Sequence, residues 1–244
     1  MTRELQTKNA LRTRTRILLG TFGGIMLLSP VASIQAQILN PLFGLYETGV
    51  TNFPSTSQPD GSSELHYTLI GGPITGTPIV ADSAGGFPIP PWLPDSPSTG
   101  SPCDSTISRW IAPIDNIGAG VPAGTYRYQT TFDLTGFDLN TVSINGCWST
   151  DNEGIDILLN GGTIGAFSPN FLGWSPFSVF GAFNQTINTL DFDVTNFGGP
   201  GGLRVTWTAL TGTLLAVPEP SSLALFGLAL IGLGAASRRR SWSG

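Results

Sequence analysis

The sequence predicts an all-β protein, an antiparallel β-sandwich or jelly roll, between two terminal segments of different character. Apolar and polar residues alternate with a period of two in several stretches, and no stretch of the central part has a helical period. The chain also has 32 Gly and 19 Pro among 244 residues, which favours short strands and many turns over long helices.

The first 36 residues have the three-part layout of a secretory signal peptide. Basic residues up to Arg16 precede an apolar run from Ile17 to Ala32, and small Ala36 follows as the expected residue before cleavage. An uncleaved membrane anchor is the alternative, but the run is short for a membrane span. We therefore expect the Sec translocase and signal peptidase to act on residues 1–36, leaving an exported domain at residues 37–216.

The exported domain is strongly acidic. Between Gln37 and Leu215 it has three arginines, no lysine and fourteen Asp or Glu residues, which gives a formal charge of about −11. Such a surface repels phosphate backbones and anionic lipids. Nucleic-acid binding is therefore excluded.

The clearest strand signal lies in residues 125–134. Alternation there predicts one buried face formed by Tyr126, Tyr128, Thr130, Phe132 and Leu134. Further stretches repeat the pattern, and their predicted inward residues are Val142, Ile144 and Trp148; Ile155, Ile157 and Leu159; Leu190, Phe192 and Val194; and Leu203, Val205, Trp207 and Ala209.

Turns and loops separate these stretches. Asn160–Gly162 predicts a tight hairpin turn. Before Pro122 the pattern is weaker: residues 64–70 are the best strand, and the proline-rich residues 85–102 predict a loop or polyproline-like segment. We assign all of this to one domain, because neither half has enough strands for two sheets.

The C-terminal segment combines a Pro-Glu-Pro triplet, an uncharged run from Leu223 to Ala236, and Arg238, Arg239 and Arg240. The run is slightly short for a bilayer-spanning helix, but the arginines fit the cytoplasmic side of a membrane. Pro218 and Pro220 prevent a helix from starting earlier, so Glu219 lies in an extended, accessible stretch.

These residues resemble the PEP-CTERM protein-sorting signal of Gram-negative bacteria, with its motif, apolar helix and arginine cluster in order. The resemblance implies a sorting motif of Val217, Pro218, Glu219, Pro220 and Ser221 within a segment at residues 217–244. It further implies transient insertion in the inner membrane, cleavage by an exosortase with Glu219 as part of the substrate, and delivery to the cell surface or extracellular space, often among exopolysaccharide. A plain tail anchor is the alternative.

Three stretches of the exported domain, "AGTYRYQTTFDLTGFD", "WSTDNEGIDILLNG" and "GGPGGLRVTW", resemble galactose-binding-like β-sandwich domains. The resemblance covers roughly residues 110–210. It implies a sandwich of the kind found in many carbohydrate-binding modules, and it implies no ligand, since this fold supports many functions.

Residues for catalysis are few. The single histidine, His66, lies in an alternating stretch and is best explained as a strand residue. One histidine and two cysteines are too few ligands for an ordinary zinc site. Asp191 and Asp193 are expected to face solvent on one strand, and a hydrolase using such a carboxylate pair is an alternative function.

Binding residues are suggested by two further groups. Asp151, Glu153 and Asp156 crowd a turn whose oxygens could hold a structural calcium ion, although turn chemistry alone also explains them. Trp174, Phe177 and Trp148 lie in or beside loops and strand ends, where aromatic rings can stack on sugars; core packing is the alternative for each. No other cofactor is expected.

Cys103 and Cys147 are the only cysteines. After export they could form one disulfide or remain as two buried thiols. Taken together, the sequence predicts a non-enzymatic, exosortase-sorted protein of the cell surface or biofilm matrix that associates with exopolysaccharide through a β-sandwich. A purely structural matrix protein without a specific ligand is the main alternative.

Overall fold

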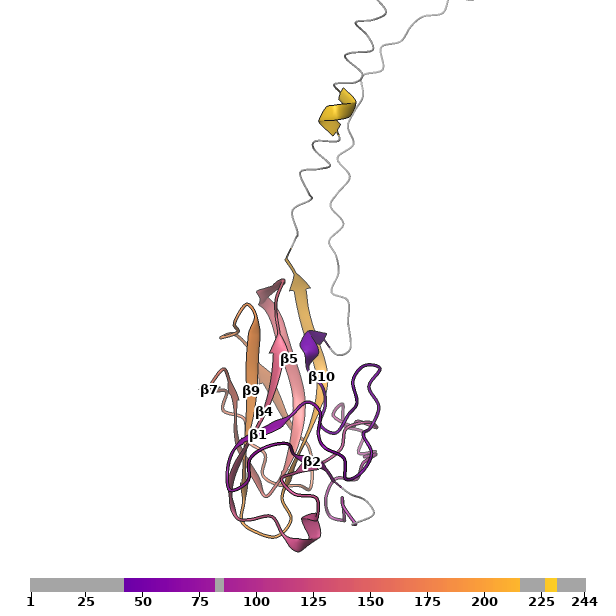
Figure 1. Cartoon of the computed structure of the whole chain (residues 1–244), viewed down its shortest axis with the longest axis vertical. Helices are drawn as coiled ribbons and strands as arrows, with labels where there is room; N and C mark the ends of the chain where they lie inside the picture. Colours follow the sequence, from indigo (N-terminus) through magenta and orange to yellow (C-terminus); the bar gives the residue numbers. More distant parts are fainter. Residues whose placement is uncertain (1–41, 82–85, 216–226, 232–244) are drawn as a thin grey trace, which may run out of the picture. The chain divides into compact units, whose positions relative to one another are not determined.

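The computed structural model describes residues 42–81, 86–215 and 227–231 (Figure 1). The predicted signal peptide, the residues Val217–Ser221 and the arginines Arg238–Arg240 lie outside these ranges. Residues 227–231 of the C-terminal apolar run are helical. Among the described residues there is no helix with the length and apolar character needed to cross a bilayer.

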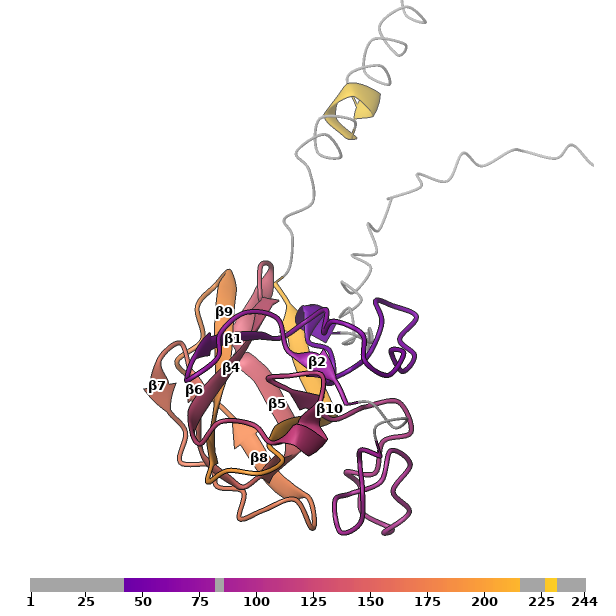
Figure 2. The same ribbon diagram turned by 60° about the horizontal axis from the view of Figure 1, so that its bottom comes forward.

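Residues 42–215 form two antiparallel five-stranded sheets, which confirms the predicted β-sandwich (Figure 2). The first sheet has the order β1-β4-β9-β6-β7, with β1 (Thr68–Gly71), β4 (Gly124–Asp133), β9 (Ile187–Asn196), β6 (Glu153–Leu159) and β7 (Gly162–Thr163). The second has the order β2-β3-β10-β5-β8, with β2 (Ile79–Val80), β3 (Ile111–Ala112), β10 (Gly202–Leu214), β5 (Phe137–Asp151) and β8 (Ser175–Val179). Of two short 3₁₀ helices, η1 (Leu42–Gly44) precedes β1 and η2 (Ile117–Ala119) lies between β3 and β4 in the chain.

The weakly patterned first part of the domain supplies edge strands to both sheets. Strand β1 pairs with β4, whereas β2 and β3 extend the second sheet beyond β10. Both sheets therefore need residues from before Pro122. Of the predicted strand at residues 64–70, only the part from Thr68 onward is a strand.

The core lies between the sheets and follows the predicted alternation. All five residues predicted for the inner face of residues 125–134 are buried, and so are Ile144, Ile157, Phe192 and Val205. Burial of these side chains stabilises the fold by about 25 cal/mol for each Å² of apolar surface removed from water.

Two inward predictions are wrong, and a β-bulge explains each. Ile155 is 46% exposed, because the register of β6 against β9 shifts between Gly154 and Asp156. Ala209 is exposed because β10 shifts against β5 between Trp207 and Ala209. An extra residue reverses which face the following side chains occupy.

The predicted hairpin turn is present. Leu159 pairs with Gly162, and the two residues between them, Asn160 and Gly161, have φ of 50° and 83°. Positive φ at both positions is the requirement of a type I′ turn, which asparagine and glycine meet at low cost.

Candidate functional site

Two of the three predicted sugar-contact residues belong to the core. Trp148 has no exposed surface and Phe177 is 6% exposed; their rings lie 5.9 and 6.0 Å from that of Phe192. Both are therefore unable to stack on a sugar in the folded protein. Trp174 is partly exposed, and its ring lies 5.2 Å from the guanidinium carbon of Arg204.

The predicted calcium ligands do not come together. Asp151 is buried and accepts a hydrogen bond from the indole N–H of Trp92 at 2.9 Å. Asp156 instead accepts bonds from the backbone N–H groups of Gly165 and Ala166, at 3.0 and 3.2 Å. No group of three or more His, Cys, Asp or Glu side chains within the described residues is placed to hold a metal ion. Asp151 therefore bonds to a distant indole, and Asp156 bonds to the backbone of the following hairpin.

Asp191 and Asp193 are buried rather than solvent-facing, at 5% and 8% exposure. Both carboxylate oxygens of Asp193 accept hydrogen bonds from the guanidinium of Arg127 on β4, at 2.6 Å each. Asp191 accepts a bond from Gln129 at 2.8 Å. These acids hold β4 against β9, an arrangement unlike the free acid and base that glycoside hydrolysis needs.

Cys103 and Cys147 are joined in a disulfide, with their Cα atoms 5.8 Å apart. Cys147 lies on β5, and Cys103 lies in the long loop between β2 and β3. The bond therefore fastens this loop to the second sheet.

A small pocket opens where the segment before β1 meets β10. It has a volume of about 50 Å³ and is lined by Leu45, Tyr46, Glu47, Val50, Ser55, Ile107 and Trp207. That is room for a few water molecules. Sequence patterns alone did not indicate this pocket, because its residues come from three distant parts of the chain.

The carboxylate of Glu47 is the charged group of the pocket, and its position is fixed. One oxygen accepts a hydrogen bond from the hydroxyl of Ser105 and the other from the hydroxyl of Thr206, each at 2.6 Å. Thr48 extends this attachment: its backbone N–H donates to Val205, and its carbonyl accepts from the N–H of Arg109. The pocket segment is thus hydrogen-bonded to β10 on one side and to the residues before β3 on the other.

The aromatic walls are also held in place. The ring of Tyr46 stacks on His66, with centroids 3.7 Å apart and planes 4° apart, and the backbone carbonyl of Tyr46 accepts a bond from the hydroxyl of Tyr67 at 3.0 Å. The ring of Trp207 packs edge-on against Phe177 at 5.8 Å.

The buried Arg204 of β10 organises the loop beside the pocket. Its guanidinium donates to the carbonyls of Pro94, Asp95 and Ser108, at 2.6, 2.9 and 2.8 Å, and its Nε donates to the Ser108 hydroxyl at 3.0 Å. Burial lowers the pKa of Arg204 to about 10, so the group stays charged at neutral pH.

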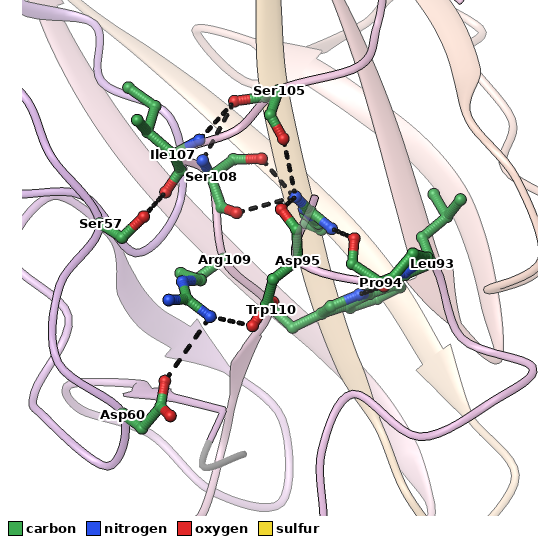
Figure 3. Close-up of polar contacts among 11 residues, drawn as sticks. Ser57, Asp60, Leu93, Pro94, Asp95, Ser105, Ile107, Ser108, Arg109 and Trp110 are labelled. Carbon is green, nitrogen blue, oxygen red and sulfur yellow. Dashed lines mark hydrogen bonds and ion pairs between the residues drawn. The ribbon is translucent and has the colours of Figure 1, made fainter. Parts of the chain in front are cut away.

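Figure 3 shows how the rest of this loop is tied down. Arg109 pairs with Asp95 and lies 3.8 Å from Asp60, and the Ser57 hydroxyl donates to the carbonyl of Ile107 at 2.9 Å (Figure 3). Ile107 is itself a pocket residue. The loop is therefore a fixed wall of the pocket.

Glu64 is a buried carboxylate bonded to the chain beside the pocket residue Val50. Glu64 accepts hydrogen bonds from the backbone N–H groups of Gly49 and His66, at 2.7 and 2.9 Å. Burial raises its pKa to about 7, against the opposing effect of these bonds. Burial lowers the pKa of the neighbouring His66.

Comparisons with known proteins bear mainly on the C-terminal segment. Residues 216–240 match the sequence profile described as the PEP-CTERM protein-sorting motif. No curated protein matches the chain. The apo form of a lectin from Pleurotus ostreatus aligns at 20% sequence identity with a TM-score of 0.35, over 45% of this chain and 32% of the lectin. The chain thus matches only about a third of that lectin, and at this TM-score the likeness carries no argument.

Proposed function

We propose, from the PEP-CTERM motif at residues 216–240, that the chain is an exosortase substrate whose exported sandwich works without catalysis and associates with extracellular polysaccharide. The motif marks an exported, surface-directed protein, and it is the observation that carries the proposal. The proposed route includes Sec-dependent export, passage through the inner membrane and removal of both ends of the chain.

The charge distribution supports this route. Eight of the eleven basic residues lie at the two ends, five before Ile17 and three at residues 238–240, and the exported part keeps only three. Basic residues that flank an apolar run stay on the cytoplasmic side during insertion, as this route requires of both ends.

A binding role is favoured over a purely structural one by the pocket beside β10. Aromatic walls, a fixed carboxylate and a hydroxyl group are the groups that saccharide hydroxyls and ring faces contact. A hydrolase is disfavoured, because Asp191 and Asp193 are engaged with Gln129 and Arg127.

Sorting is tested with Glu219→Ala in a Gram-negative host that carries an exosortase. We expect the variant to accumulate in the inner membrane and the wild-type protein to be found outside with neither residues 1–36 nor the arginine tail, as read by mass spectrometry. Ser241→Ala, beyond the arginines, is the matched control and should be sorted normally. Normal release of the Glu219 variant would contradict the sorting proposal.

Polysaccharide association is tested separately, by applying the exported wild-type protein to a glycan array that includes the host's own polymer. Binding to at least one polymer is expected. Absence of binding to every polymer would favour the purely structural alternative.

A further inference from the structure

We infer that the pocket formed by Tyr46, Glu47, Ser55 and Trp207 is a subsite for one residue of a neutral, hydroxyl-rich saccharide. The inference rests on the proposed association with polysaccharide, and it adds the place and the chemical class of the sugar.

Glu47 gives the pocket its acceptor. Each of its carboxylate oxygens already accepts one hydrogen bond, from Ser105 or from Thr206, and each has a further lone pair that can accept another. Sugar hydroxyls are donors of the right kind, and hydrogen bonds to a carboxylate are stronger than those between neutral groups. Because both oxygens are fixed before binding, little ordering is needed when a ligand arrives.

Tyr46 and Trp207 give the pocket its apolar surface. Tyr46 is backed by His66 and Trp207 by Phe177, so neither ring has to be ordered on binding. Both residues are partly exposed, unlike Trp148 and Phe177, which the core covers. Partly exposed aromatic rings beside a hydrogen-bonding group suit a ligand with one apolar face and a polar edge.

Charge decides the class of sugar. The exported part carries a formal charge of about −11, from three arginines against fourteen acids, and Glu47 itself lines the pocket. A uronate or sulfated residue would bring a second negative charge next to this carboxylate, and like charges repel strongly when partly desolvated. The pocket therefore selects uncharged residues.

Size decides how the sugar enters. A volume of about 50 Å³ admits the hydroxyl-bearing edge of one residue but not a segment of a chain. A chain end or a side branch fits this geometry. Single-site binding is consequently weak, and repeated residues along a polymer would strengthen it.

The test uses exported protein recovered from the host and three probes, dextran and galactomannan as neutral polymers and alginate as an acidic one. Affinity electrophoresis should show retardation by at least one neutral polymer and none by alginate. Glu47→Gln, nearly identical in shape, should weaken neutral-polymer binding at least tenfold. Ser55→Phe fills the pocket mouth from a partly exposed position and should weaken binding to the same extent.

Two control variants lie outside the pocket lining. Glu153→Gln makes the same chemical change at another partly exposed glutamate, and Phe53→Ala removes a ring that is 64% exposed. Both should bind as the wild type does, and thermal unfolding identifies any variant that has lost its fold.

The outcomes separate the two proposals. If wild-type protein binds a neutral polymer and both pocket variants bind equally well, the pocket assignment is overturned while polysaccharide association stands. Binding to alginate alone overturns the charge argument. If no probe and no polymer of the glycan array binds wild-type protein, polysaccharide association and the subsite fall together.

Discussion

The guanidinium carbon of Arg204 lies 5.2 Å from the ring centroid of Trp174. A cation at this distance from an indole is a favourable contact, and more so when it is shielded from water. The arginine has no exposed surface, and its donors go to backbone carbonyls and one serine hydroxyl. Trp174 therefore helps to cover a buried charge, which accounts for a tryptophan outside the main core.

Arg204→Lys is expected to destabilise the protein by about 3 kcal/mol, because lysine cannot reach the carbonyls of Pro94, Asp95 and Ser108 together and leaves some of them unpaired. Urea unfolding monitored by tryptophan fluorescence measures this. Arg127→Lys is the matched control. Because the Arg127 side chain is 39% exposed, this substitution should lower the free energy of unfolding clearly less than Arg204→Lys does. Equal losses at both positions would show that Arg204 does not organise the loop.

Gly154→Ala is expected to be severely destabilising. A Cβ atom at this position would lie 2.4 Å from the ring of Trp148, which is fully buried in the core. Forcing a methyl group into a packed core typically costs about 1–3 kcal/mol. Thermal unfolding checks this.

Gly173→Ala is the control, because a Cβ at Gly173 meets no atom within 4 Å. The control should unfold within a degree or two of the wild type. A Gly154 variant as stable as the Gly173 variant would mean that Trp148 can shift.

The strands of the core could be predicted from the sequence because burial on one face imposes a period of two. On β4, every second residue from Tyr126 to Phe132 is buried, as this period requires. The prediction for Ile155 is wrong because one extra residue at the Gly154 bulge reverses the faces, and alternation alone does not reveal a bulge.

The pocket could not be predicted, for a different reason. Glu47 and Thr206, whose side chains bond at 2.6 Å, are 159 residues apart in the chain. Nothing local to either residue identifies its partner. Trp148 is predicted as a sugar contact because the sequence near a strand end does not show which residues cover a tryptophan. In the structure, Phe192 and Gly154 pack against its ring.

Replacing both cysteines by serine is expected to lower the free energy of unfolding by about 4 kcal/mol. The disulfide closes a loop with a sequence separation of 44, and opening it gives the unfolded chain more freedom. Unfolding with and without a reducing agent measures the same quantity in the wild type. If reduction leaves the unfolding curve unchanged, or peptide mapping finds two free thiols, the disulfide does not fasten the loop in solution.

Glu64 is expected to make the protein less stable as the pH rises from about 4.5 to about 7. Its pKa is raised by burial from 4.5 to about 7, so within this range the folded state holds a proton that the unfolded state has released. Stability therefore falls by about 1.4 kcal/mol per pH unit for this one site, or about 3 kcal/mol over the range, and then levels off.

Urea unfolding of wild type and Glu64→Gln at pH 4.5, 5.5, 6.5 and 7.5 isolates this contribution as the difference between the two curves. The variant should keep a smaller fall, because burial also raises the pKa of Asp151, to about 6. Glu153→Gln, at a partly exposed glutamate, controls for the substitution itself. If the difference in stability between the wild type and Glu64→Gln stays constant from pH 5 to 7, the carboxyl is already ionised in the folded protein.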